Sequence, residues 1–194
     1  MNRKIQLGLI LLIIIGLPAF AWYYLNKGTQ MRKSAMENLS PKSEMGNFQT
    51  VTEKDSLYYS QSLQGKRWIV GIIGADSMRL SHIKALRDLV GQAKLEFAVN
   101  VFTIIGLFQG ELITEMSDKL EIGRETDWVK TYMASNHVFP FSADAFSVPE
   151  SHANQNIIAL VDEEGRMRNY YKLEDKEEIK TAVREIPVFL SLKK

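Results

Sequence analysis

The sequence predicts an α/β fold in which a central mixed β-sheet is flanked by helices. Two continuous apolar runs, residues 67–73 and 95–105, are separated by an amphipathic stretch of helical period. A β-hairpin pattern over 156–171 and a final amphipathic helix pattern follow them. Buried strands that alternate with helices at this spacing are typical of sheets that contain parallel strands.

The expected domain opens with a short hairpin and then a buried strand. Residues 48–52 and 56–60 favour strands, and the charged residues 53–55 between them favour a turn. The run from Arg67 to Ile73 is apolar from its second residue onward. Because it does not alternate with polar residues, it indicates a strand that is buried on both faces.

A helix is expected to follow, beginning near Met78. Its apolar side chains recur at helical spacing: Leu80, Ile83, Leu86 and Val90. Gly91 predicts the end of this helix, because glycine is frequent just after a helix C-terminus. The apolar run 95–105 is expected to be the next strand, so that the crossover joins a parallel pair.

The second half is expected to contain a helix at 127–135, capped by Thr126, and a hairpin. The apolar face of that helix would comprise Trp128, Tyr132 and Met133. The hairpin strands are 156–161 and 166–171, joined by the turn 162–165. Two aromatic segments are expected to be loops that pack on the domain or present a patch to a partner: 136–141 and 146–149.

The last expected element is a helix from Asp175 to about Leu190. Asp175 and Glu178 form a capping-box pattern at its start. Pro187 is expected to kink or end it, because proline lacks the backbone N–H that a helix interior needs.

Composition limits the possible functions. The 194 residues are 45% hydrophobic and 24% charged, which fits one globular domain with an appendage. The net charge of +1 provides no electrostatic footprint for nucleic acid. The sequence contains no cysteine, which excludes disulfides, thiolate metal sites and cysteine nucleophiles.

The N-terminus predicts export. Ile5 to Leu25 carries no charged side chain and follows Arg3 and Lys4. An uncharged run of about 20 residues is long enough to span a membrane as a helix, and the aromatic residues 22–24 favour the membrane interface. The alternative is a cleaved signal peptide, since residues 19–21 match a small-x-small cleavage site.

These patterns divide the chain into three segments. Residues 1–25 are expected to be a membrane anchor or signal peptide, 26–45 a linker, and 46–194 the α/β domain. We expect a single-pass protein of the cell membrane, attached through its N-terminal helix, with the domain on the extracytoplasmic (periplasmic) side.

The order β-α-β, α, β-hairpin, α is the layout of a thioredoxin-like domain, and three segments resemble the Sco/SenC family. They are the turn 63–66, the strand–turn–helix 68–90, and residues 151–171, which include LVDEEGRMRNYY. Members of that family are membrane-anchored thioredoxin-fold proteins that handle copper during assembly of cytochrome c oxidase. The resemblance covers about residues 48–190 and implies the fold and a protein partner in the respiratory chain.

The chain departs from that family at its copper site. The family binds copper with two cysteines spaced C-x-x-x-C and one histidine. By the resemblance, these positions fall on Asp76, Leu80 and His152. Leucine has no ligand atom and aspartate is a hard oxygen donor, whereas Cu(I) prefers sulfur ligands. The resemblance therefore implies the scaffold without the family's copper chemistry.

A replacement metal site is the alternative. Asp76, Met78, His82 and His152 would offer a carboxylate, a thioether and two imidazoles to copper or another divalent ion if the fold brought them together. Otherwise His82 is a surface helix residue, Met78 covers the helix start, and His152 is a hydrogen-bonded loop residue.

Three functions remain open at this point. We expect a membrane-anchored binding or assembly factor related to cytochrome c oxidase biogenesis, without redox or enzymatic activity and without a cofactor. The alternatives are a copper-binding protein and a cysteine-independent redoxin-like enzyme. The enzyme hypothesis lacks an activated nucleophile in the sequence.

Overall fold

The computed structural model describes residues 3–54, 56–114, 116 and 128–192, with side chains from residue 12 onward. The expected cap Thr126 and the expected turn residue Asp55 lie outside the described residues. The chain divides into two compact units, Met1–Glu37 and Asn38–Lys194.

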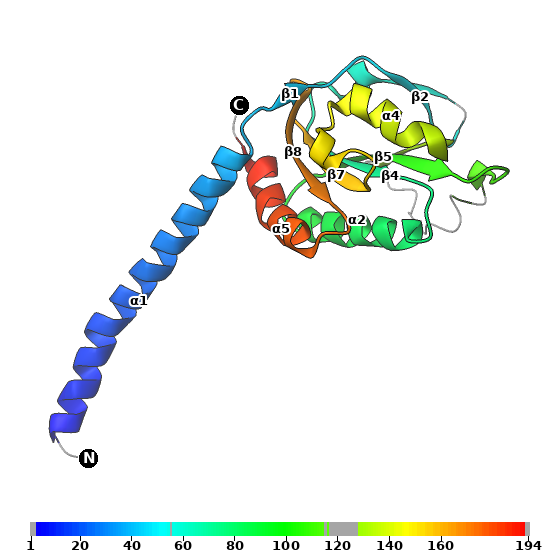
Figure 1. Ribbon diagram of the computed structural model, residues 1–194. Coiled ribbons are helices and arrows are strands. Elements are labelled where there is room, and N and C mark those ends of the chain that lie inside the picture. Colours follow the sequence, from blue (N-terminus) through cyan, green and yellow to red (C-terminus); the bar gives the residue numbers. More distant parts are fainter. Residues whose placement is uncertain (1–2, 55, 115, 117–127, 193–194) are drawn as a thin grey trace. The chain divides into compact units, whose positions relative to one another are not determined.

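The first unit is formed by the helix α1, Arg3–Asn38, which contains Pro18 (Figure 1). Among the described residues, none of the helices combines the length and apolar character needed to cross a membrane. The membrane span expected over 5–25 stays a prediction, because the side chains of residues 5–11 lie outside the described part of the chain. The segment 26–45, expected to be a linker, contains the last turns of α1 and the strand β1, Ser43–Glu44.

The second unit is built on a mixed β-sheet with the strand order β1-β8-β7-β4-β5-β6. The remaining strands are β4 (Trp68–Ile73), β5 (Asn100–Leu107), β6 (Trp128–Ala134), β7 (Ile157–Val161) and β8 (Arg166–Lys172). Strands β4, β5 and β6 are parallel, whereas β7 is antiparallel to both β4 and β8. The predicted mixed sheet, the parallel pair and the late hairpin are confirmed.

The predicted opening hairpin is also confirmed. Strands β2, Gln49–Val51, and β3, Leu57–Tyr59, pair antiparallel, and the short helix η1, Ser60–Leu63, follows them. Thr52 forms a β-bridge with Thr131 of β6. The hairpin therefore reaches the outer edge of the main sheet and covers part of it.

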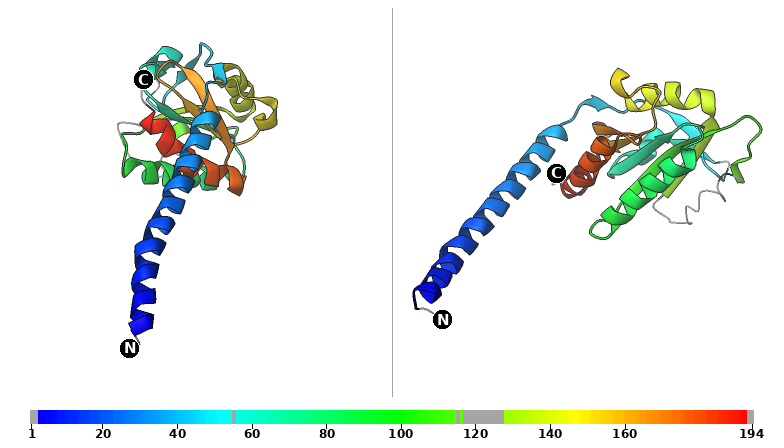
Figure 2. Two further views of the ribbon diagram at one scale, coloured as in Figure 1. Left: turned by 90° about the vertical axis from the view of Figure 1, so that its left-hand side faces the viewer. Right: turned by 60° about the horizontal axis from the view of Figure 1, so that its bottom comes forward.

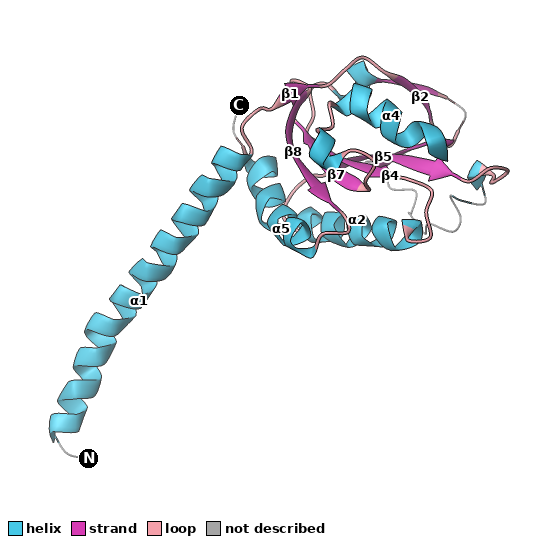
Figure 3. Cartoon of the chain, viewed as in Figure 1, coloured by secondary structure: helices cyan, strands magenta, loops and turns pink. Residues whose placement is uncertain are grey.

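Helices cover both faces of the sheet. Figures 1 and 2 show α2, Arg79–Lys94, and α5, Lys176–Ser191, side by side on one face. Figure 3 shows α4, Ser135–Phe146, on the opposite face. A short helix η2, Glu150–His152, precedes β7. This three-layer arrangement explains why the central strands are apolar on both sides.

Side chains of β4 alternate between two cores. Ile69 and Ile73 pack in the core beneath α2 and α5. Val70 and Ile72 pack in the core beneath α4, which also contains Phe102. All six residues of β4 are buried, as predicted for a strand covered on both faces.

The helix predicted at 127–135 is wrong, because the described part of this segment is the edge strand β6. The spacing of Trp128 and Tyr132 fits one helical face, but in β6 both lie on the same side of a strand (period 2) and are buried. The parallel partner β5 offers a continuous ladder from Val101 to Leu107, and pairing with it overrides the local pattern.

The loop expected at 136–141 is instead the first half of α4. Val138 and Phe146 are fully buried, so the aromatic segments pack on the domain rather than forming an exposed patch. Gly91 does not end α2, which continues to Lys94 and delays the next strand to Asn100.

The helix predicted after Asp175 is confirmed as α5, with one change at its start. The Asp175 carboxylate accepts hydrogen bonds from the backbone N–H groups of Glu177 and Glu178. The Glu178 carboxylate accepts from the backbone N–H of Lys172 and does not complete a capping box. Pro187 lies inside α5 and does not end it.

Candidate functional site

The candidate site lies where three chain segments meet at one end of the central strands, which we call this edge of the sheet. The carboxyl end of β4 is next to the beginning of β7, which in turn pairs with the end of β8: Ile72 pairs with Ile157, and Ile157 with Lys172. The turn 74–78, the start of α2 and the connection from β8 to α5 therefore share this edge. In open α/β sheets, ligands bind at the carboxyl ends of the strands.

Asp76 is fixed in the turn after β4 by two uncharged donors. Its Oδ1 accepts from the Met78 backbone N–H at 2.7 Å, and its Oδ2 accepts from Asn156 Nδ2 at 2.6 Å. Asn156 Oδ1 accepts from the Gly74 backbone N–H at 2.7 Å. One buried amide at the start of β7 therefore positions both the turn backbone and the carboxylate.

Two glycines allow the turn to lie so close to its neighbours. A Cβ on Gly106 of β5 would lie 2.6 Å from the backbone nitrogen of Ala75. A Cβ on Gly74 would lie 2.8 Å from Cζ of Phe139 in α4. Both contacts are shorter than normal van der Waals distances, so larger residues would push the turn out of place.

Arg79 anchors the start of α2 beneath the turn. Its guanidinium forms a two-point ion pair with Glu111 at 2.8 Å for each bond and donates to the Gly106 carbonyl at 2.6 Å. The Cζ atom lies 4.8 Å from the centre of the Phe108 ring. Because Arg79 is buried and its charge is neutralised by Glu111, it acts as a structural tie rather than as a free cation.

The fold brings His82 and Asp76 together with Glu174, which follows β8. Each of the three residues offers a ligand atom, and these atoms lie within 4.8 Å of one another. His82 is buried and Glu174 is exposed, and His82 Nε2 lies 3.9 Å from Glu174 Oε1. Two carboxylates and one imidazole therefore lie close together beside the turn after β4.

The other expected ligands are placed differently. The Met78 side chain is 53% exposed, and that of Leu80, on the second family cysteine position, is 50% exposed. Leu80 has no atom that binds a metal, so the two cysteine positions of the resembled family do not fit Cu(I) here.

His152 is held apart from that cluster by its own partners. Its Nδ1 lies 2.9 Å from Ser151 Oγ, and its Nε2 lies 3.3 Å from Glu178 Oε2. The ring forms one wall of a small pocket that also includes Phe139 and Ile157. His152 is therefore hydrogen-bonded at the end of the short helix η2 rather than in the loop expected from the sequence.

Glu174 and Asn156 are the members of this region that sequence reasoning missed as site residues. Glu174 belongs to a charged run that is typical of a solvated turn. The signal available in the sequence was its place directly after a hairpin strand, because that strand ends at the same sheet edge as β4. Asn156 was assigned only to the start of a strand, although a buried asparagine needs specific partners.

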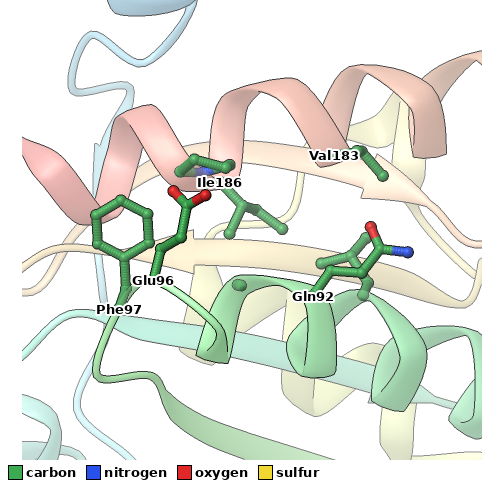
Figure 4. Close-up of a pocket in the computed structure, with 8 residues that line it drawn as sticks. Gln92, Glu96, Phe97, Val183 and Ile186 are labelled. Carbon is green, nitrogen blue, oxygen red and sulfur yellow. The ribbon is translucent and has the colours of Figure 1, made fainter.

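A second hollow lies away from this edge, between α2 and α5 (Figure 4). It is lined mostly by apolar side chains, with polar Gln92 and Glu96 on one side and Val183 and Ile186 on the other. Among the described residues, its lining contains no cluster of metal ligands or nucleophiles.

No protein-family model and no curated protein matches the sequence. Many solved structures are similar, and three of them represent the range. BsSco, a member of the Sco family of cytochrome c oxidase assembly proteins, has a TM-score of 0.57 at 15% identity, covering 74% of this chain and 96% of BsSco. Copper-bound ScoI of Arabidopsis thaliana has a TM-score of 0.55 at 12% identity, covering 74% and 98%.

The third is a thioredoxin domain of a thiol-disulfide oxidoreductase from Bacteroides vulgatus. Its TM-score is 0.51 at 13% identity, and the match covers 76% of this chain and 98% of that one. At such identities the likeness establishes the fold alone. The chain therefore has a thioredoxin-like α/β fold of the kind found in Sco/SenC proteins, which confirms the resemblance expected from the sequence.

Proposed function

We propose that this protein is a thiol-free binding or assembly factor of the Sco type that acts in the biogenesis of cytochrome c oxidase. The proposal combines the fold with the chemistry of the turn after β4. Asp76, on the first family cysteine position, accepts from Met78 N–H and Asn156 and so holds the turn in place. Leu80, on the second position, is half exposed and apolar.

The turn at 74–80 is the observation that carries this proposal. It keeps the strand–turn–helix geometry in which thioredoxin-fold proteins place reactive groups, but it contains no thiol, and its single sulfur atom is the thioether of half-exposed Met78. Half-exposed Met78 and Leu80 on its surface are suited to contact with another protein. A role in binding therefore agrees better with these residues than a role in redox catalysis.

The test is deletion of the gene in its native host. We expect cytochrome c oxidase activity in membranes to fall and added copper not to restore it, because the protein does not deliver copper. The gene supplied in trans should restore activity. Normal oxidase activity in the deletion strain would contradict the proposal, and full rescue by copper alone would contradict its thiol-free, copper-independent part.

Two matched variants locate the contact. Leu80→Glu places a charge on the turn, whereas Leu95→Glu places one on a leucine that is 86% exposed just after the other end of α2. We expect Leu95→Glu to restore oxidase activity in the deletion strain and Leu80→Glu to fail, with equal amounts of both proteins. Equal rescue by both variants would rule out the turn as the contact surface.

We further propose that residues 5–25 hold the domain at the extracytoplasmic face of the cell membrane. The support is the absence of charge from Ile5 to Leu25 and the aromatic residues at its end. The full chain is expected to remain in the membrane pellet after an alkaline carbonate wash and to be accessible to protease from outside the cytoplasm. Release into the soluble fraction would overturn this part.

A further inference from the structure

We propose that Asp76, His82 and Glu174 form a binding site for one divalent cation of the zinc type. The ligand atoms of these residues lie within 4.8 Å of one another. They come from the turn after β4, the first turns of α2 and the connection between β8 and α5. The set shares only Asp76 with the positions of the family copper ligands, since neither Leu80 nor His152 belongs to it.

The buried imidazole of His82 is the first argument. His82 is 5% exposed, and its Nδ1 is buried without a hydrogen-bond partner. Its Nε2 lies 3.9 Å from Glu174 Oε1, which is too long for a hydrogen bond. Nε2 therefore faces Glu174 without a hydrogen bond, and a neutral imidazole nitrogen in such a position can bind a cation.

The net charge of the cluster also favours a bound cation. Two carboxylates face one imidazole, so the cluster carries about two negative charges when the histidine is neutral. Within the described part of the chain, neither Asp76 nor Glu174 forms an ion pair with a lysine or arginine. The nearest arginine in sequence, Arg79, is already neutralised by Glu111. A divalent cation would balance the charge that the protein leaves uncompensated.

The support around the ligands is the third argument. Asn156 donates to Asp76 Oδ2 and is itself fixed by the Gly74 backbone, so the first carboxylate is oriented before any ion binds. Metal ligands in proteins are commonly held in this way by neighbouring hydrogen bonds. The Glu174 side chain is 67% exposed, so it is the ligand that can move onto the ion.

Distances and ligand types select the ion. Ligands of zinc lie at about 2.0–2.2 Å, which places tetrahedral neighbours about 3.4 Å apart. The 3.9 Å between His82 and Glu174 needs only a small movement of the exposed glutamate to reach that value. One nitrogen and two oxygens suit Zn²⁺ and other borderline or hard divalent ions, whereas Cu(I) prefers sulfur. Three protein ligands leave a fourth position open to water or a partner's side chain.

The experiment titrates tag-free, full-length protein in detergent with Zn²⁺ against a competing chelator at pH 7.5. We expect one equivalent to bind with a micromolar or lower dissociation constant. Glu174→Gln removes one ligand at an exposed position and is expected to weaken binding at least tenfold. Glu177→Gln, an exposed glutamate in the first turn of α5, is the matched control and should change binding less than twofold.

Histidine NMR provides a readout that is independent of affinity. The chain has three histidines, so their ring proton signals can be assigned with single variants. Zn²⁺ is expected to shift the His82 signals and leave those of His137 and His152 unchanged. The proposal is overturned by binding no tighter than millimolar, by equal weakening in Glu174→Gln and Glu177→Gln, or by a shift of His152 in place of His82. None of these outcomes depends on oxidase activity, which tests the proposed function separately.

Discussion

Two turns of this domain are organised by an aspartate, and their partners differ. In the β7–β8 hairpin, Asp162 Oδ2 bonds to Arg166 Nε at 2.9 Å and to Arg168 Nη2 at 2.7 Å. Its Oδ1 accepts from the backbone N–H groups of Glu164 and Arg166. In the turn after β4, Asp76 is bonded by uncharged donors alone.

The difference separates a turn built for stability from one that retains charge. Asp162 is 3% exposed, and two arginines neutralise it. Asp76 is partly exposed, and the groups that converge on it are a second carboxylate and an imidazole. In the hairpin turn, the Asp162 carboxylate is fully paired by hydrogen bonds and ion pairs. In the turn after β4, the Asp76 carboxylate remains able to bind a cation. Substitutions at the two turns should therefore have different consequences for stability.

The largest effect is expected from Asp162→Ala. Removal of a buried carboxylate leaves two backbone N–H groups and Arg168 without their acceptor, which should lower the free energy of unfolding by about 3 kcal/mol. Urea denaturation followed by circular dichroism measures this loss. A loss below about 1 kcal/mol would show that solvent replaces the lost partners. Asp162 would then contribute no more to stability than Asp76 does in the turn after β4.

Acid should remove part of the same contribution. Burial raises the pKa of Asp162, but hydrogen bonds from Arg166 and Arg168 outweigh it and hold the pKa below its ordinary value. The stabilisation is therefore complete above the unfolded-state pKa of about 3.9 and is lost as pH falls through the lower folded-state pKa.

The check compares wild type with Asp162→Asn in urea at several pH values. Because the variant has no carboxyl group at this position, the difference in unfolding free energy should be constant from pH 7 to about 5 and shrink below about pH 4. A difference that stays constant to the lowest pH at which the protein folds would show that the charge of Asp162 does not stabilise the hairpin.

The glycine that lies against each turn is expected to show the reverse order. Gly106→Ala places a Cβ 2.6 Å from the Ala75 backbone nitrogen, and backbone atoms cannot rotate away, so we expect a loss of about 2–3 kcal/mol. Gly165→Ala meets only the end of the Met45 side chain at 3.7 Å. Its cost comes from a φ of +79° and should be about 1 kcal/mol.

Thermal unfolding of the two alanine variants provides the measurement, with wild type as reference. Gly106→Ala is also expected to lower Zn²⁺ affinity, because the displaced turn carries Asp76. Equal losses of stability for both variants would mean that the turn after β4 shifts easily and is not held in a fixed geometry.

The sequence predicted these two turns unequally well. The hairpin around Asp162 was predicted correctly, because an acidic turn ending in glycine between two apolar runs is a local signal. The buried strand β4 and the helices α2 and α5 were also predicted from local periodicity. These elements determine most of the fold.

What the sequence did not predict depends on contacts between distant segments. β6 was predicted as a helix, because the spacing of Trp128 and Tyr132 fits that period and the free edge of β5 leaves no local trace. Glu174 reaches His82 only because β8 and β4 end at the same sheet edge. The membership of a site assembled from three segments therefore follows from topology, which the pattern of single residues does not specify.

The smallest effect is expected at Asp76 itself. Asp76→Ala removes the acceptor of the Met78 N–H in the turn before α2 and should cost about 1 kcal/mol, as is typical of one lost hydrogen bond. Asp175→Ala is the matched control, because Asp175 caps α5 through Glu177 and Glu178 N–H and should cost about the same. Asp76→Asn retains an oxygen for the Met78 N–H but sets two amide nitrogens against each other at Asn156, so it should not recover the stability that Asp76→Ala loses. If Asp76→Ala lost as much stability as Asp162→Ala in urea, Asp76 would be a structural residue of the same kind, and the uncompensated charge at the turn would no longer distinguish the two regions.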